Sequence, residues 1–215
     1  MCGRFALQST ADELADYFNA HPPQQFVSRF NIAPTTPVIA RTAKELTFFQ
    51  WGLVPSWAKD LSIGHRMFNA HSETIGEKPS FRNAFKRRRC LVPASGFYEW
   101  KAEAGGKQPY YCHLTDPLFC FAGIWEHWQD AMGNELQSCA ILTTESKGPM
   151  ADIYQRMPVV IKPEFQHQWL DHQDENTQRA SECIEDGESA FEIYPVSKMV
   201  NAARNDSAQL IEPLS

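Results

Sequence analysis

The chain has 215 residues, of which 43% are hydrophobic and 21% are charged, and this composition excludes intrinsic disorder, collagen and extended coiled coils. A chain of this length buries a substantial core, and we expect a single domain over residues 1–215. The formal net charge of −6 argues against a generic nucleic-acid coat.

The first predicted element is a helix over residues 10–19. Thr10 and Glu13 form a capping-box pattern, and apolar residues follow at helical spacing. Short runs rich in β-branched and aromatic residues then predict strands. These runs cover residues 37–41, 46–51, 89–93, 96–101, 109–114, 118–124, 138–143 and 157–161.

The predicted connections favour antiparallel pairing. Gly105-Gly106 is typical of a hairpin turn between two of the strands. Peripheral helices are predicted over 163–171, 176–185 and, capped by Asp206, 207–211. Because alternating βαβ units are missing, we expect an α+β fold with a mostly antiparallel, barrel-like sheet.

Charge is distributed unevenly along the chain. Residues 164–192 hold nine acids and one base, whereas five bases lie within residues 82–89. This basic cluster is interpreted either as a solvated helix face or as an edge that contacts phosphates.

The six cysteines form no Cys-x-x-Cys pair, which argues against zinc ribbons and thioredoxin-type motifs. No signal-peptide pattern opens the chain and the apolar runs are too short to span a membrane. We therefore expect a cytoplasmic protein, nucleoid-associated if bacterial, with no membrane partner and no obligate protein partner.

Cys2 is the residue with the most distinctive chemistry. A small residue after Met1, followed by Gly3, favours removal of the initiator, which leaves an α-amine and a thiol on adjacent carbons. Such an aminothiol either attacks an acyl carbon, with the amine as base, or condenses with an aldehyde to an imine that the thiol closes to a thiazolidine. An α-amine pKa of about 7.7–8.0 leaves roughly a quarter of the amine unprotonated near neutral pH.

Two families begin with a Cys of this kind. The N-terminal-nucleophile glutamine amidotransferases pair theirs with an Asn-Gly motif, which this chain lacks, so an amidohydrolase ranks second. The ordered motifs of this chain instead resemble the SRAP family, the SOS-response-associated peptidases or abasic-site processing proteins. The motifs are "MCGRF" (1–5), "RFNIAP" (29–34), "WGLVPSW" (51–57), "FNAHSET" (68–74), "RCLVPASGFYEW" (89–100), "ILTTES" (141–146), "DIYQRMPVVI" (152–161), "YPVSKMVNAARND" (194–206) and "LIEPL" (210–214).

The resemblance implies a sensor and shield of abasic sites in single-stranded DNA. In that family, Cys2 would form a covalent thiazolidine with the sugar aldehyde, a lyase-like Schiff-base chemistry without metal or cofactor. Release of the protein's own Met1 is also implied. A third interpretation is a non-covalent module for single-stranded DNA whose site has decayed.

The resemblance also implies site residues. Cys2, Asn69 and Glu99 match the family's catalytic positions, and Tyr154 stands where the family commonly has His. Tyr, with an ordinary pKa near 10, is a poorer proton shuttle than His, which titrates near 6.5. The implied DNA contacts are Arg4, His71 (where the family usually has Arg), Thr143, Arg156, Arg204, Trp51 and Trp57.

Overall fold

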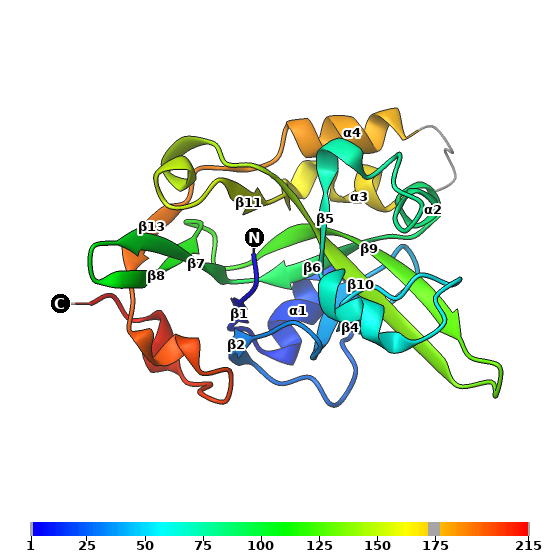
Figure 1. The fold of residues 1–215 in the computed structure, drawn as a ribbon, viewed down its shortest axis with the longest axis horizontal. Coiled ribbons are helices and arrows are strands. Elements are labelled where there is room, and N and C mark those ends of the chain that lie inside the picture. The colour runs from blue at the N-terminus through cyan, green and yellow to red at the C-terminus, as the bar shows by residue number, and fades with distance from the viewer. Residues whose placement is uncertain (1, 172–176, 215) are drawn as a thin grey trace.

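A closed barrel of strands forms the centre of the fold (Figure 1). The computed structural model describes residues 2–171 and 177–214. Within the barrel, the β10–β4 contact is parallel and the contacts between the other neighbouring strands are antiparallel, which confirms the expected α+β class with a mostly antiparallel, barrel-like sheet. Around the barrel, the order is β4 (Leu46–Trp51), β3 (Pro37–Arg41), β6 (Arg89–Ala94), β9 (Phe119–Gln129) and β10 (Glu135–Glu145), which returns to β4.

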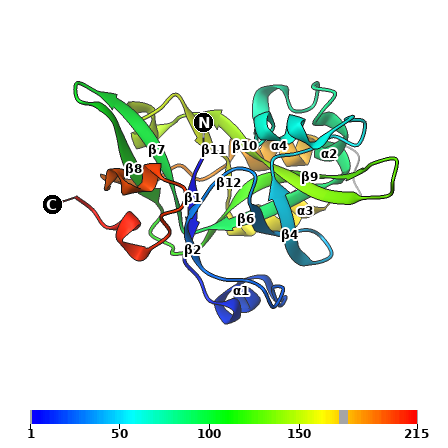
Figure 2. The same cartoon turned by 60° about the horizontal axis from the view of Figure 1, so that its bottom comes forward.

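A second, antiparallel sheet stands beside the barrel. Its order is β13 (Glu192–Pro195), β8 (Gly106–His113), β7 (Gly96–Glu103), β1 (Phe5–Leu7) and β2 (Arg29–Ile32). The β7–β8 hairpin turns at the predicted glycine pair and extends away from the barrel in both views (Figures 1 and 2). Only Ser95 separates β6 from β7, so the two sheets are continuous through that residue.

Shorter elements complete the edges. β5 (Asn69–His71) and β11 (Arg156–Pro158) both pair with β10, and β12 (Val160–Ile161) pairs with β9. The helices are α1 (Ala11–Phe18), α2 (Arg82–Arg87), α3 (Gln166–Leu170) and α4 (Gln178–Glu185). Short 3₁₀-helices cover Leu61–Arg66, Ser72–Thr74, Gly148–Asp152, Pro163–Phe165, Lys198–Asn201 and Ala208–Ile211.

The barrel core anchors the N-terminal strand. The Phe5 ring lies edge-on to Trp51 at 5.2 Å and to Phe121 at 5.6 Å, between ring centroids. All three side chains are buried, and aromatic pairs in this arrangement are favourable beyond the area that they bury. The buried Phe5 therefore fixes the position of the residues just before it, including Cys2.

Most predicted elements are confirmed, with local differences. The capping box at Thr10 forms as expected. The predicted strand 157–161 is two strands, because the chain changes partner at Val159 from β10 to β9. Asp206 does not cap the last turn; its carboxylate instead accepts a hydrogen bond from Arg29 Nε at 3.1 Å. The predicted start of the helix at residue 176 lies outside the described residues.

Among the described residues, no helix has the length and apolar character needed to cross a membrane. In the same residues, no cluster of three or more His, Cys, Asp or Glu side chains is arranged to hold a metal ion.

Candidate active site

Cys2 lies where the N-terminal segment meets β7. Its side chain has 0% exposure. The carbonyl of Arg4 accepts a 3.0 Å hydrogen bond from the Tyr98 amide, which holds the segment alongside β7 (Figures 1 and 2). Gly96, which pairs with Ala6, leaves room for the Tyr111 ring, because a Cβ there would stand 2.2 Å from it. The backbone thus places Cys2 next to the strand that carries Glu99.

Asn69, at the start of β5, contacts the same segment. Its Nδ2 donates a 2.8 Å hydrogen bond to the carbonyl of Cys2. Its Oδ1 is buried and accepts no hydrogen bond from the described residues. β5 is itself held in register by parallel pairing of Asn69 with Ile141 on β10. The side-chain amide of Asn69 is therefore held against the N-terminal backbone, and its oxygen is available to accept a hydrogen bond from a ligand.

Glu99 is a buried carboxyl group, 3% exposed, in the middle of β7. Burial raises its pKa above the ordinary value, because a charged carboxylate is poorly solvated there. Burial also raises the pKa of the Cys2 thiol, and the charge of Glu99 adds to that rise. The thiol is therefore protonated at neutral pH, and the carboxyl group keeps its proton to a higher pH than an exposed one.

A cavity of about 430 Å³ opens at this place. Glu99 and Tyr154 both line it, so the structure brings together two predicted residues from separate motifs. Tyr154 is 38% exposed, and its phenol is accessible from solvent. Four further lining residues were missed from the sequence; they are Phe68, Trp100, Lys107 and Asn201.

Two of the lining residues, from distant segments, are joined by a hydrogen bond. Trp100 Nε1 donates to Asn201 Oδ1 at 2.8 Å. Both residues lie in the ordered motifs of the sequence. Trp100 directly follows Glu99, and Asn201 lies in the same motif as Arg204. The two residues are 101 positions apart in the chain, so no local sequence pattern reveals their contact.

Arg4 is held by acceptors of the protein itself. Its Nη1 donates to Asn31 Oδ1 at 2.8 Å and to the Val200 carbonyl at 2.7 Å. Asn31 is fully buried and also donates to the carbonyls of Val200 and Asn205. Arg4 therefore joins the N-terminal segment to the 198–205 loop, and its role as a phosphate ligand stays a prediction.

Arg156 is engaged in a similar way. Its two terminal nitrogens donate to the Glu73 carboxylate at 2.8 and 2.9 Å, and one also donates to the Thr143 carbonyl at 2.6 Å. Hydrogen bonding from Arg156 lowers the pKa of Glu73 to about 2. Such a bidentate pair fixes the guanidinium plane. A DNA phosphate at Arg156 would compete with Glu73.

Burial argues against two predicted DNA contacts, Trp51 and Thr143. Trp51 is a core residue with 0% exposure whose Nε1 donates to the Phe68 carbonyl at 2.8 Å, so its ring has no face for a base. Thr143 also has 0% exposure, and its hydroxyl contacts the Arg156 guanidinium rather than solvent. Trp57 differs from both because it is 58% exposed.

The two tryptophans offer a matched test of stability. We expect Trp51→Ala to lower the free energy of unfolding by about 3–5 kcal/mol, because a large cavity opens in the barrel core. Trp57→Ala should change it by no more than about 0.5 kcal/mol, as is usual for a surface side chain. Urea denaturation of the two variants measures both values. Equal stabilities would show that Trp51 is not part of the core.

The remaining basic candidates lie on the surface. His71 and Arg204 are exposed, and neither lines the cavity. The basic cluster forms α2 and the start of β6. Arg88 pairs with Glu126 at 2.7 Å, and Arg89 is buried, donating to backbone carbonyls. Part of the cluster is thus structural.

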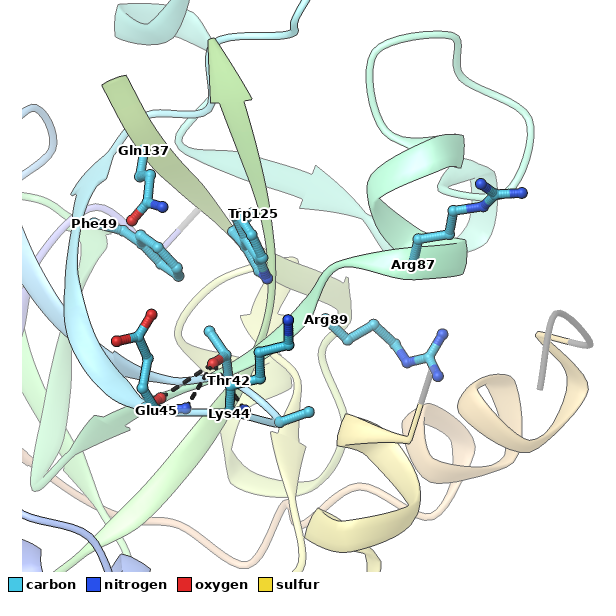
Figure 3. A pocket seen from close by; sticks show the side chains of 9 residues that line it. Thr42, Lys44, Glu45, Phe49, Arg87, Arg89, Trp125 and Gln137 are labelled. Carbon is cyan, nitrogen blue, oxygen red and sulfur yellow. Dashed lines mark hydrogen bonds between the residues drawn. The ribbon is translucent and has the colours of Figure 1, made fainter. Parts of the chain in front are cut away.

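A second cavity, of about 310 Å³, lies elsewhere on the barrel (Figure 3). Phe49 and Trp125 stack beside it, with 5.2 Å between ring centroids, and Gln137 comes from the neighbouring strand. The Arg89 guanidinium points away from it (Figure 3). None of the predicted site residues lines this cavity.

The sequence of this chain matches a known protein family and several curated relatives. Residues 1–203 match the SOS response associated peptidase (SRAP) family. The chain is 37% identical to the abasic site processing protein YoqW of Bacillus subtilis, over 99% of both chains. It is 29% identical to the abasic site processing protein YedK of Escherichia coli, over 100% of both chains.

Solved structures support the fold. A protein from Bacteroides thetaiotaomicron superposes with a TM-score of 0.90 over 100% of both chains at 24% identity, which bears on the fold alone. A phage-related protein from Bordetella bronchiseptica superposes with a TM-score of 0.73 at 33% identity, over 92% of this chain and 95% of that one. The family match and the relatives that align over the full length establish that this chain belongs to the SRAP family.

Proposed function

We propose that this protein processes abasic sites in single-stranded DNA and shields them as a covalent adduct on Cys2. The observation that carries the proposal is the position of Cys2, which contacts Asn69 and interacts with Glu99 beside the cavity that Tyr154 lines. Relatives named abasic site processing proteins support the substrate class.

The chemistry requires that Met1 be released, by an aminopeptidase or by the protein itself. The amine of Cys2 then adds to the aldehyde carbon of the opened sugar, and loss of one water gives an imine. The thiol sulfur adds to the same carbon, and the thiol proton ends on the ring nitrogen. The product is a thiazolidine, no electron is exchanged, and no oxidant is needed.

The thiol's raised pKa favours this order of steps. A protonated thiol is a weak nucleophile, so the amine makes the first bond and sulfur closes the ring afterwards. Glu99 suits proton transfer in both directions, because burial keeps it protonated to a higher pH than usual. Asn69 Oδ1, which has no partner among the described residues, is available to accept a hydrogen bond from the new amine.

Tyr154 gives a prediction about the rate of reaction. A phenol transfers protons less readily near pH 7 than an imidazole does. We expect Tyr154→His to accelerate adduct formation and reversal by about 100-fold, the lower end of the usual range for general acid–base catalysis. Time courses with abasic DNA, followed by exchange onto a labelled strand, measure both rates. Unchanged rates would mean that residue 154 transfers no proton.

The test of the proposed function uses single-stranded DNA with one abasic site and a denaturing gel. A covalent band is expected with the abasic strand and not with the intact strand. Glutamine hydrolysis without a band would favour an N-terminal-Cys amidohydrolase. A native gel shift without a covalent band would favour a non-covalent DNA-binding module.

A further inference from the structure

We infer that Lys107 binds a phosphate of the DNA strand at the mouth of the cavity that holds Glu99 and Tyr154. This inference rests on the proposed function, because it concerns how the same cavity receives its substrate. The first observation concerns the charges of the residues that line the cavity. Among the six that line it, Lys107 is the one cation.

Lys107 is placed at the cavity by the β7–β8 hairpin. It sits on β8 directly opposite Ala102, one residue beyond the turn, and its side chain is exposed. Burial raises the pKa of the Glu99 carboxyl group and has the largest effect on it, whereas the positive charge of Lys107 lowers the same pKa. The ammonium group therefore shares the electrostatic environment of Glu99 while remaining open to solvent.

Two arginines that were predicted to contact DNA already bind acceptors of the protein. Arg4 donates to Asn31 and to a backbone carbonyl, and Arg156 is held by both oxygens of Glu73. The ammonium group of Lys107, in contrast, forms no hydrogen bond or ion pair with any residue that the structure describes. It is thus the cation that a ligand can reach without displacing a contact of the protein.

The chemical structure of an abasic nucleotide suits recognition by a cation at the mouth of this cavity. Such a nucleotide has no base, so a protein can recognise only its sugar and its two flanking phosphates. If the sugar enters the cavity toward Glu99, a flanking phosphate remains at the mouth. A flexible, strongly hydrated ammonium is suited to such a contact because it acts as a point charge without demanding one geometry.

The test separates binding from the covalent chemistry. Single-stranded DNA with a tetrahydrofuran abasic analogue, which has no aldehyde, is titrated against the unaltered protein and against Lys107→Met and Lys107→Arg. Lys101→Met is the matched control, because Lys101 lies on the same hairpin and does not line the cavity. A second assay measures cross-linking to a true abasic strand.

The loss of one phosphate contact on a single strand makes the slope of log K against log salt less steep by about 0.7. If the variant and the unaltered protein bind equally at 1 M salt, the variant then binds about fivefold more weakly at 0.1 M salt. We expect this change for Lys107→Met, and near-normal binding for Lys107→Arg and Lys101→Met. This pattern supports the phosphate contact even if the unaltered protein forms no cross-link, in which case only the proposed chemistry fails.

Other results would overturn the inference. Normal affinity and salt slope for Lys107→Met would show that the ammonium does not meet a phosphate. An equal loss for Lys101→Met would point to general charge instead of a site. An adduct on Lys107 after borohydride treatment would make this lysine a nucleophile in place of a phosphate ligand.

Discussion

Replacing Cys2 by alanine is expected to abolish the stable adduct with abasic DNA. Alanine keeps the amine, so an imine still forms, but no thiol is present to close it to a thiazolidine. Cys2→Ser should give at most a short-lived adduct, because an oxazolidine is less durable. Denaturing gels with and without borohydride distinguish these cases, since borohydride traps the imine of the alanine variant.

Cys183→Ala serves as the matched control for the loss of a thiol. Cys183 is a buried thiol on α4, away from the site, and its loss should leave the adduct yield unchanged. A stable adduct of normal yield with Cys2→Ala would contradict the role of the terminal thiol. Loss of the adduct in both variants would point to a general defect in folding.

Glu99→Gln is expected to slow adduct formation by about 10²- to 10⁴-fold, equivalent to about 3–5 kcal/mol of activation free energy. Glutamine keeps the size and the hydrogen-bonding capacity of the side chain but cannot exchange a proton. Single-turnover time courses with excess abasic DNA measure this change. Glu99→Asp is the companion variant, and partial activity in it would confirm that a carboxyl group is needed.

The raised pKa of Glu99 also predicts how the rate of ring opening depends on pH. The protonated carboxyl can donate to the sugar oxygen during ring opening, and its pKa is raised by burial. In the unaltered protein the rate of ring opening should therefore fall as the pH rises through that raised pKa, which lies above the ordinary value near 4.3. Glu99→Gln should lack this dependence. The same pH dependence in both proteins would assign the proton to another group.

The sequence predicted the long elements well because their signals are local. The capping box at Thr10 and the glycine pair at the hairpin are short patterns with one structural meaning. The strands β1, β2, β5 and β13 are only three or four residues long, and their pairing depends on neighbours far along the chain. Closure of the barrel through the parallel β10–β4 contact was likewise not visible from any local pattern.

The candidate site was predicted through motifs, and the order of motifs carries no information about burial or about contacts between distant segments. Motif order identified Cys2, Asn69 and Glu99, which the structure brings together. Motif order could not tell a buried tryptophan from an exposed one, so both Trp51 and Trp57 were predicted to contact DNA. Nor could it show Lys107, whose significance comes from its place in the lining of the cavity.

Mass spectrometry of the adduct is the most direct test of the central claim, that the aminothiol of Cys2 captures the abasic sugar. After cross-linking, the DNA is digested and the N-terminal peptide is fragmented. We expect a peptide that begins at Cys2, lacks Met1 and carries the sugar remnant on its first residue, with the loss of one water. A remnant on any other residue, or on a peptide that retains Met1, would contradict it.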